Sequence, residues 1–459
     1  MRLVFMLLVM NFSLRPLLGD EPQLPPNIVF ILADDLGWAD LGCYGSSYHE
    51  TPNIDKLARN GMTFTAAYAC PNCQPTRAAL MSGQHGVRTG VYTVGGNSKK
   101  DTSKTPLIPI ENVPELPMAN ITVADVLTKA GYVTGMFGKW HLGNGKFNPW
   151  NRGFAKSLVS LDGRHFDFST SPQMDIPKGT YLADHLTDHA IKFIETNHTR
   201  PFFLYVPHFA VHHPLQAKEE LIAKFRNKPG VGGQSNPTYA GMIASVDESV
   251  GRIVDKLDEL KLSERTLVIF TSDNGGFGGF AAEGIKTKVD TTSNAPLRGG
   301  KGMLYEGGVR VPWIARWPTT IKPGTTCGEP ISSIDLFPTC LDVAITKSPE
   351  KYPLDGLSML PLLKGERKLN RPAIYWHFPG YFGPGKGVWY GVPGGAVRAG
   401  DYKLIEWFDD RPVELYDLAN DLGEKTNVAD AELAKRDELL KLIHDWRTSF
   451  KAPMPASRN

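Results

Sequence analysis

Two cysteines, Cys70 and Cys73, stand three positions apart in the stretch CPNCQPTRAALMSG. A Cys-x-x-Cys pair of this spacing is typical of a redox centre, of half a zinc site, or of a structural disulfide. The chain holds five cysteines, the others being Cys43, Cys327 and Cys340. In an exported protein an odd number leaves at least one thiol without an internal partner. The spacing alone leaves all three kinds of site open.

Oxygen-bearing side chains end two apolar runs. Asp34 and Asp35 directly follow NIVFILA, and Asp273 and Asn274 follow TLVIFTS. An isolated Asp-Asp pair is typical of a helix cap or a solvated turn, but two such clusters at predicted strand ends favour a metal site. Carboxylate and amide oxygens suit Ca²⁺ or Mg²⁺, whereas zinc would also take histidine or cysteine.

Basic and imidazole side chains end or follow further apolar runs. Lys139 and His141 follow GYVTGMF, His212 and His213 come after PFFLYV, and Lys301 lies within PLRGGKGMLYEGG. Taken one at a time, each is more typical of a solvated or structurally satisfied side chain. The glycines around Lys301 permit a close backbone approach to a ligand. Together these residues suggest one site for an anionic group.

The elements that must position these residues form an α/β pattern. Apolar runs at 27–33, 131–137, 201–206 and 266–271 are typical of strands buried on both faces of a largely parallel sheet. Amphipathic helices are predicted between them, for example over 122–130, with a threonine cap, and over 239–260. Ligands bind at the carboxyl ends of the strands in such sheets. The Asp, Asn, Lys and His residues that follow these four runs all fall at those ends.

The composition is that of a large globular protein. The chain has 459 residues, of which 41% are hydrophobic and 21% charged, so neither class indicates disorder. Its formal net charge of +2 gives no reason to expect nucleic acid or an anionic membrane as partner. Residues 1–20, with a cationic start and a short apolar run, are predicted to be a signal peptide of a secreted or periplasmic protein. No later segment has the ~20 apolar residues of a transmembrane helix.

A smaller C-terminal α+β domain is predicted over 369–459, after a catalytic domain over 21–368. Residues 376–395 are rich in glycine, proline and aromatic residues, which indicates loops. The runs AVRAGDYKLIEWF and VELYDL predict two antiparallel strands, and a terminal helix follows. The aromatic loop is expected to contact a substrate or to form a domain interface, through Trp376, His377, Tyr381, Trp389 and Tyr390.

Residues 73–77, Cys-Gln-Pro-Thr-Arg, resemble the sulfatase signature Cys-x-Pro-Ser/Thr/Ala-Arg. Thr76 stands where serine is commonest, and Met81-Ser82-Gly83 stands where the family has Leu-Thr-Gly. Further segments resemble the family in family order and cover nearly the whole chain: PNIVFILADDLGWADLGCYG, TPNIDKLARNGMTFTAAYA, GMFGKWHLG, FTSDNGG, PLRGGKGMLYEGGVRVPWIARWP and ELYDLANDLGEKTNVA.

The resemblance implies an alkaline phosphatase-like fold and a sulfuric ester hydrolase. It implies that Cys73 is oxidised to formylglycine by a formylglycine-generating or anaerobic sulfatase-maturating enzyme, and that its hydrate forms a covalent enzyme-sulfate. One calcium, with magnesium possible, would be bound by Asp34, Asp35, Cys73, Asp273 and Asn274. Arg77 would hold the hydrate, Lys139 and Lys301 the sulfate oxygens, and His141 and His212 would transfer protons. His213 occupies a more variable position and is left out of this set.

Three other functions compete with this one. A thiol–disulfide oxidoreductase would leave the acidic, lysine and histidine clusters without a role. A phosphodiesterase or phosphonate monoester hydrolase of the same fold is the main alternative, although a two-metal enzyme should show more ligands. A non-catalytic glycan-binding protein is the third, if Cys73 is never modified. The resemblance further implies a sulfated carbohydrate substrate, of galactose or N-acetylgalactosamine type, or an aryl sulfate.

Overall fold

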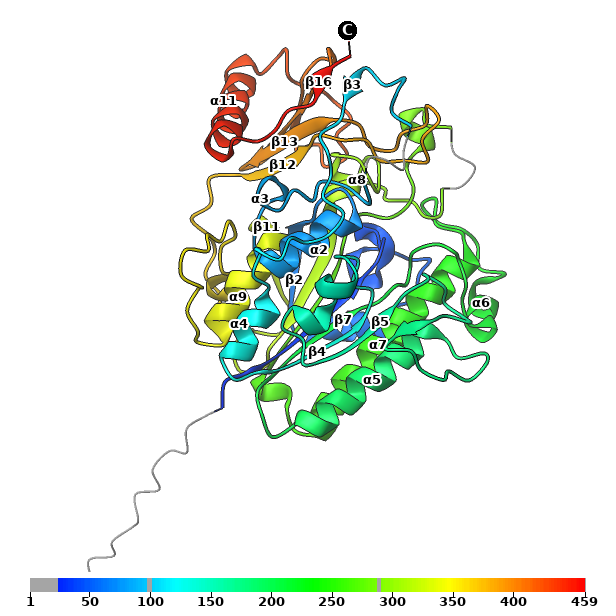
Figure 1. Ribbon diagram of the computed structural model, residues 1–459. Coiled ribbons are helices and arrows are strands. Elements are labelled where there is room, and N and C mark those ends of the chain that lie inside the picture. Colours follow the sequence, from blue (N-terminus) through cyan, green and yellow to red (C-terminus); the bar gives the residue numbers. More distant parts are fainter. Residues whose placement is uncertain (1–23, 97–100, 287–289, 459) are drawn as a thin grey trace, which may run out of the picture.

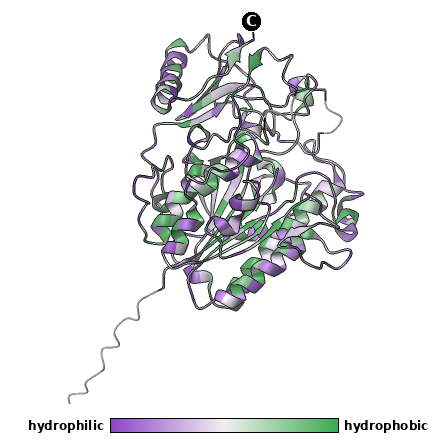
Figure 2. Cartoon of the chain, viewed as in Figure 1, coloured by the Kyte–Doolittle hydropathy of each residue, from purple (hydrophilic) through white to green (hydrophobic). Residues whose placement is uncertain are grey.

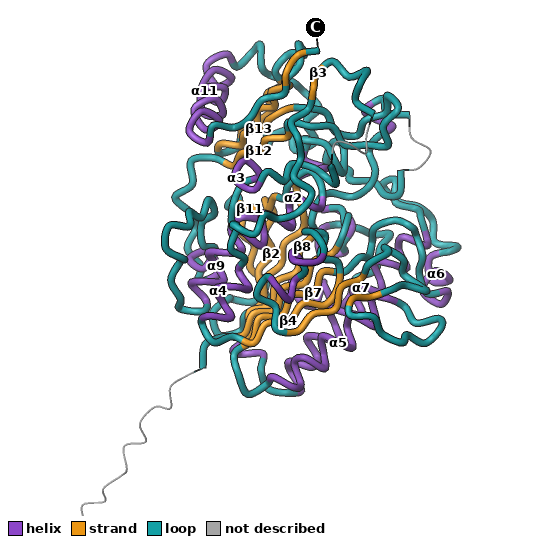
Figure 3. The backbone as a smooth tube through the Cα atoms, viewed as in Figure 1, coloured by secondary structure: helices purple, strands orange, loops and turns teal. Residues whose placement is uncertain are grey.

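A mixed sheet runs through the larger part of the protein (Figures 1 and 3). The computed structural model describes residues 24–96, 101–286 and 290–458, so the predicted signal segment 1–20 lies outside the described residues. Within the described chain the sheet has ten strands. In spatial order they are β10 (Thr325–Cys327), β2 (Met62–Tyr68), β9 (Arg310–Arg316), β8 (Thr266–Ser272), β1 (Asn27–Ala33), β7 (Phe202–Pro207), β4 (Val133–Gly138), β5 (Lys156–Ser160) and β6 (Thr170–Ser171), while β11 (Ile331–Ser332) pairs with β2.

The centre of the sheet is parallel. β1 pairs in parallel with β8 on one side and with β7 on the other, and β7 pairs in parallel with β4. β9 runs antiparallel to both β2 and β8, and β6 runs antiparallel to β5. The four central strands are the four apolar runs identified in the sequence. The predicted mixed, mainly parallel α/β sheet is therefore confirmed.

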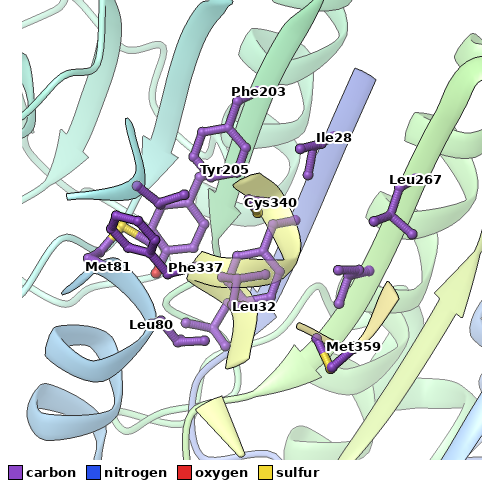
Figure 4. Close-up of a cluster of buried hydrophobic side chains, with 14 of the residues drawn as sticks. Ile28, Leu32, Leu80, Met81, Phe203, Tyr205, Leu267, Phe337, Cys340 and Met359 are labelled. Carbon is purple, nitrogen blue, oxygen red and sulfur yellow. The ribbon is translucent and has the colours of Figure 1, made fainter. Parts of the chain in front are cut away.

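Successive residues of β1 face two separate cores, which explains why the whole strand is apolar. Ile28, Phe30 and Leu32 pack into the core shown in part in Figure 4, together with side chains of α2 (Cys73–Ser82), α4 (Val123–Lys129) and α9 (Leu336–Val343). Val29, Ile31 and Ala33 pack on the other face against α1 (Pro52–Arg59), α5 (Leu182–Asn197) and α7 (Pro237–Glu259). Hydrophobic and hydrophilic residues alternate along these helices, as in amphipathic helices (Figure 2).

The two helices predicted from the sequence form with capped starts. At α4, Thr122 and Asp125 make a reciprocal capping box, with the Thr122 side chain accepting from the Asp125 amide. At α7, the side chain of Asn236 accepts from two amides and Pro237 occupies the first turn. Among the described residues no helix is both long and apolar enough to cross a membrane.

The C-terminal part forms a second, antiparallel sheet with the order β12 (Ile374–Phe378), β13 (Gly394–Ala399), β14 (Tyr402–Trp407) and β15 (Glu414–Asp417). The prediction of only two strands here was wrong. The first predicted run turns at Gly400, whose φ of 59° favours glycine, and so forms β13 and β14. The helix α11 (Leu433–Phe450) packs on this sheet, and β16 (Ala456–Ser457) returns to pair with β3 (Leu107–Ile108).

A buried ionic network joins the two sheets. The Lys403 ammonium lies 2.9 Å from a carboxylate oxygen of both Glu306 and Glu424. Arg310 and Tyr68 donate to the other oxygen of Glu306 at 2.6 and 2.8 Å. Because buried charges are costly without partners, this pairing fixes the C-terminal sheet in one position. Sequence patterns gave no sign of it.

The aromatic stretch at 376–390 is largely structural, which corrects the expectation of an exposed loop. Trp376 belongs to β12, is buried, and donates from Nε1 to the carbonyl of Ala69 at 2.8 Å. Tyr381 is also buried. Trp389 and Tyr390 are half-buried and remain available to a ligand. The stretch therefore combines a domain interface with two partly accessible rings.

Candidate active site

The two acidic clusters meet because their strands are parallel neighbours. Ala33, the last residue of β1, is in register with Ser272, the last residue of β8. Beyond these ends, the Asn274 amide donates to Asp35 Oδ1 at 2.8 Å, and the Asp35 backbone N–H donates to Asp273 Oδ1 at 3.2 Å. Asp35 has a φ of 61°, a left-handed conformation that the surrounding contacts must hold.

Cys73 is the first residue of α2, and its side chain points into this acidic cluster. It is 1% exposed, and its sulfur lies within 4.8 Å of carboxylate oxygens of Asp34 and Asp273. All five cysteines lie in the described part of the chain and none is paired with another. Burial raises the pKa of the Cys73 thiol. A redox thiol needs a lowered pKa, so this environment does not suit a redox pair with Cys70.

Arg77 lies one turn along α2 and is fully buried. Its Nε and Nη2 donate to Asp273 Oδ2 at 2.9 and 2.7 Å, and Nη2 also donates to Asp34 Oδ2 at 2.8 Å. Nη1 donates to the backbone carbonyl of Lys139 at 2.7 Å. The guanidinium thus joins the helix that carries Cys73 to the ends of three strands.

Each of the two lysines pairs with one of the adjacent aspartates, Asp34 and Asp35. Lys139 Nζ lies 2.5 Å from Asp34 Oδ2, and Lys301 Nζ lies 2.6 Å from Asp35 Oδ1. Burial alone would raise the pKa of Asp34, but Lys139 and Arg77 hold that pKa well below its usual range. An ammonium has three donors, so each lysine retains donors for an anionic ligand.

A glycine before Lys139 makes this geometry possible. Gly138 has a φ of 141°, and a Cβ built there would lie 1.9 Å from the carbonyl oxygen of Pro207. The ends of β4 and β7 therefore approach more closely than any side chain would allow. Lys139 and the residues after Pro207 consequently reach one site.

His212, one of the two predicted proton-transfer residues, lies beside the carboxylates. His212 Nε2 lies 3.7 Å from Asp35 Oδ2, and its Nδ1 lies 2.6 Å from the carbonyl oxygen of His213. Because a carbonyl only accepts, Nδ1 carries a proton and Nε2 faces the site. Burial and the nearby Lys301 lower the pKa of His212 to about 4. Burial, with the charges of Lys139 and Arg77, also lowers the pKa of His141 well below its usual value.

The donor set fits one hard cation. Asp34 Oδ1 and Asn274 Oδ1 are buried, and neither has a hydrogen-bond partner among the described residues. Burial and the neighbouring Asp34 raise the pKa of Asp273 to about 6, a sign of excess negative charge. Unpartnered buried oxygens at converging carboxylates suit Ca²⁺ or Mg²⁺. The half-zinc-site hypothesis needs both Cys70 and Cys73, and only Cys73 reaches this cluster.

Three positioning residues could not be found from the sequence. The hydroxyl of Tyr239 lies 2.7 Å from Asp40 Oδ2, its nearer acceptor, and 3.2 Å from the carbonyl oxygen of Asp35, and so supports the Asp34–Asp35 turn. His165 Nε2 lies 2.9 Å from the carbonyl oxygen of His212. Asp40, at the end of the short helix Trp38–Asp40, and His165, in a loop, are both fully buried.

The chain belongs to the sulfatase family. The model of the family described as Sulfatase matches residues 26–346, about seven-tenths of the chain. A second model, described as N-sulphoglucosamine sulphohydrolase, C-terminal, matches residues 300–447. The fold, the acidic strand ends and the Cys-x-Pro-x-Arg segment thus belong to a sulfuric ester hydrolase, an enzyme whose substrate is a sulfate ester.

Particular relatives are similar over most of their length. N-acetylgalactosamine-6-sulfatase of Mus musculus is 32% identical, and the match covers 95% of this chain and 82% of the relative. Arylsulfatase A of Homo sapiens is 33% identical, with 94% and 89% covered. The crystal structure of Ps i-CgsB in complex with k-i-k-neocarrahexaose has a TM-score of 0.78 at 30% identity over 92% of each chain.

The same fold also occurs with a different activity. The phosphonate monoester hydrolase of Agrobacterium radiobacter has a TM-score of 0.68 at 20% identity. This likeness concerns the fold alone. The family match favours sulfate over phosphonate esters for the present chain.

Proposed function

We propose that this enzyme releases inorganic sulfate from a sulfated carbohydrate, with oxidised Cys73 as its nucleophile. The observation that carries the proposal is the burial of Cys73 between Asp34 and Asp273, at the start of a helix fixed by Arg77. A plain thiol with a raised pKa is a poor nucleophile in such a place. Conversion of Cys73 to formylglycine by a maturation enzyme would give this position a function.

The aldehyde hydrate would supply one hydroxyl for attack on sulfur and a second hydroxyl whose deprotonation expels sulfate. A calcium or magnesium ion, when bound, lowers the pKa of such a hydroxyl and offsets the carboxylate charge. The residues that would hold the ion are Asp34, Asp35, Asp273, Asn274 and the modified Cys73. The two oxygens without a partner, on Asp34 and Asn274, support this assignment.

The chain's own residues would bind the sulfate and move the protons. Lys139 and Lys301, already held against the carboxylates, would stabilise charge on the sulfuryl oxygens. His212, whose Nε2 faces the site, would protonate the leaving alcohol. His141 would take the proton from the second hydroxyl. Arg77 would act by fixing Asp34 and Asp273, because its donors are engaged there.

The proposed substrate class rests on the relatives. One is named for N-acetylgalactosamine 6-sulfate, and a structural neighbour was solved with a neocarrahexaose. A galactose- or N-acetylgalactosamine-type sulfate is therefore the first substrate to test. The N-terminal sequence supports export to the periplasm or the outside of the cell, or a lysosomal route in a eukaryote.

Mass spectrometry of the peptide that contains residues 73–77 tests the modification. The protein should be made with a sulfatase-maturating enzyme, and the peptide should show an aldehyde where the thiol stood. Cys73→Ser should release no sulfate from any ester, while Cys70→Ser serves as the matched control and should keep activity. An active enzyme with an intact Cys73 thiol would contradict the proposal.

Measured release of sulfate from a panel of sulfated galactose and N-acetylgalactosamine derivatives tests the substrate class. A phosphonate monoester belongs in the same panel, because that activity occurs on this fold. Faster hydrolysis of the phosphonate than of every sulfate ester would favour the other activity.

A further inference from the structure

A small cavity lies at the junction of the two sheets, beside the active-site segment that carries Lys301. Its volume is about 240 Å³. Its wall includes Gly302, Tyr305, Trp389, Tyr390, Trp407 and Arg411. Sites for drug-sized molecules usually occupy ~300–1,000 Å³, so this junction pocket suits a single ring-sized group.

The aromatic rings of the junction pocket are fixed by contacts with other side chains of the protein. Tyr390 stacks on Phe280 with ring centroids 4.3 Å apart, and Trp389 contacts Tyr381 at 5.0 Å. Trp407 donates from Nε1 to Glu414 at 2.9 Å. Rings fixed in this way lose little conformational freedom when a ligand stacks on them.

Arg411 supplies donors at the same pocket. Its guanidinium lies 4.1 Å from the ring centroid of Trp407, and its Nε is paired with Asp409 at 2.8 Å. The two Nη groups donate no hydrogen bond to any described residue. The acidic lining residue Glu283 does not pair with Arg411, because Arg298 donates to both of its carboxylate oxygens at 2.8 Å. Donors without partners beside aromatic rings suit a ligand that is flat on one side and rich in oxygen.

The junction pocket lies next to the active site. Gly302, which lines the pocket, directly follows Lys301, and its amide donates to the carbonyl of Pro71 at 2.6 Å, two residues before Cys73. Lys301 Nζ lies 5.8 Å from the ring centroid of Phe382, and that ring lies 6.0 Å from Tyr390. One layer of aromatic rings therefore separates the sulfate-binding lysine from the pocket.

We propose that the junction pocket binds a second sugar ring of an oligosaccharide whose sulfated end occupies the active site. Trp389 and Tyr390 would stack on the apolar face of the ring, and the Nη groups of Arg411 would donate to its hydroxyl or sulfate oxygens. A sugar ring has both an apolar face, which can stack on aromatic rings, and oxygen atoms around its edge, which can accept hydrogen bonds. This inference rests on the proposed function, since it extends the substrate from one sulfated sugar to a chain.

The test compares substrates of different length that share the same sulfated terminal sugar. kcat/KM is measured for the sulfated monosaccharide, for the tetrasaccharide that ends in it, and for 4-nitrophenyl sulfate. The enzymes are wild type, Trp389→Ala and Arg411→Ala, each with formylglycine formation verified. Trp150→Ala and Arg226→Ala, exposed residues that do not line the pocket, are the matched controls.

Wild type should prefer the tetrasaccharide, and each pocket variant should lose about tenfold more kcat/KM on the tetrasaccharide than on the other two substrates. Trp389→Phe should retain most of the preference. If Trp389→Ala does not fold, the comparison is made with Arg411→Ala, because Arg411 is exposed and its replacement should not affect folding. Equal losses on all substrates, or a wild-type enzyme that hydrolyses sugar sulfates without regard to length, would overturn this inference alone. Absence of hydrolysis with every sulfate ester would instead overturn the proposed function.

Discussion

Arg77 and Asp273 are joined by two hydrogen bonds, from Nε at 2.9 Å and Nη2 at 2.7 Å to the same carboxylate oxygen, although 196 residues separate them in the chain. Both side chains are fully buried. The pair connects the second turn of α2 with the end of β8. The position of Cys73 relative to the acidic cluster therefore depends on this contact.

Arg77→Gln is expected to destabilise the fold strongly, because it leaves Asp34 and Asp273 buried with less compensating charge. Loss of one partner of a buried ion pair costs about 3–5 kcal/mol. The midpoint of urea unfolding should fall accordingly. Arg88→Gln is the matched control: Arg88 also pairs with an aspartate, Asp355, but is partly exposed, and its loss should cost less than about 1 kcal/mol. Similar losses for both variants would argue against a special role of Arg77.

Removal of divalent cations should lower both sulfate release and thermal stability. The proposed ligands are oxygens, so calcium or magnesium should restore both properties. A ligand present at 100 times its Kd stabilises the folded state by about 2.7 kcal/mol. Melting temperatures with chelator and with added calcium measure the effect, which should vanish in Asp273→Asn. Elemental analysis that finds stoichiometric zinc in active enzyme would contradict the assignment.

His212→Ala should slow the hydrolysis of sugar sulfates far more than that of 4-nitrophenyl sulfate. A sugar alcohol is a poor leaving group that needs a proton, and general acid catalysis contributes about 10²–10⁴-fold. 4-Nitrophenolate leaves without such help. The ratio of kcat/KM between the two substrates is the measurement, and it is independent of the amount of active enzyme. An unchanged ratio would assign the proton transfer to another residue.

Protonation of His212 should also shape the acidic side of the pH profile. Burial and Lys301 lower its pKa to about 4 in the free enzyme, so the protonated form becomes more abundant as the pH falls from 7 toward 4. kcat/KM for a sugar sulfate should therefore rise over this range wherever the enzyme remains folded. The rise should be lost in His212→Ala. An identical pH profile for the variant would refute this role.

His208 should make the fold less stable in acid. It is completely buried, and burial lowers its pKa from 6.5 to about 4. As the pH falls through 6.5 the unfolded chain binds a proton that the folded chain does not bind until about pH 4, so stability decreases over this interval. The loss is on the order of 3 kcal/mol.

The difference in unfolding free energy between wild type and His208→Gln isolates this contribution, because other titrating groups cancel. Glutamine can retain the hydrogen bond that His208 Nε2 makes with Ser249 Oγ at 3.0 Å. The difference should shift in favour of the variant as the pH falls from 7 to 4. A constant difference for His208→Gln would contradict the expectation.

Sequence patterns were sufficient to predict the central sheet and to expect the candidate site residues at one edge of it. Runs buried on both faces have a simple signature, and parallel strands must gather their carboxyl ends at one edge. For that reason Asp34, Asp35, Asp273 and Asn274 could be expected to meet. The Cys-x-Pro-x-Arg segment likewise identified Cys73 and Arg77 before any contact was known.

The tertiary structure alone decided how those residues are held and what surrounds them. Arg77 binds the Asp273 carboxylate, and Tyr239 supports the Asp35 turn, through contacts that span 196 and 204 residues and have no periodic signature. Trp376 resembled a loop residue because glycine and proline surround it, yet packing between the sheets buries it. The junction pocket arises from residues at 283–285, 302–305, 389–392 and 407–411, which meet only on folding. Local residue pattern specifies strands and motifs, whereas the shape of a pocket depends on how the finished elements pack.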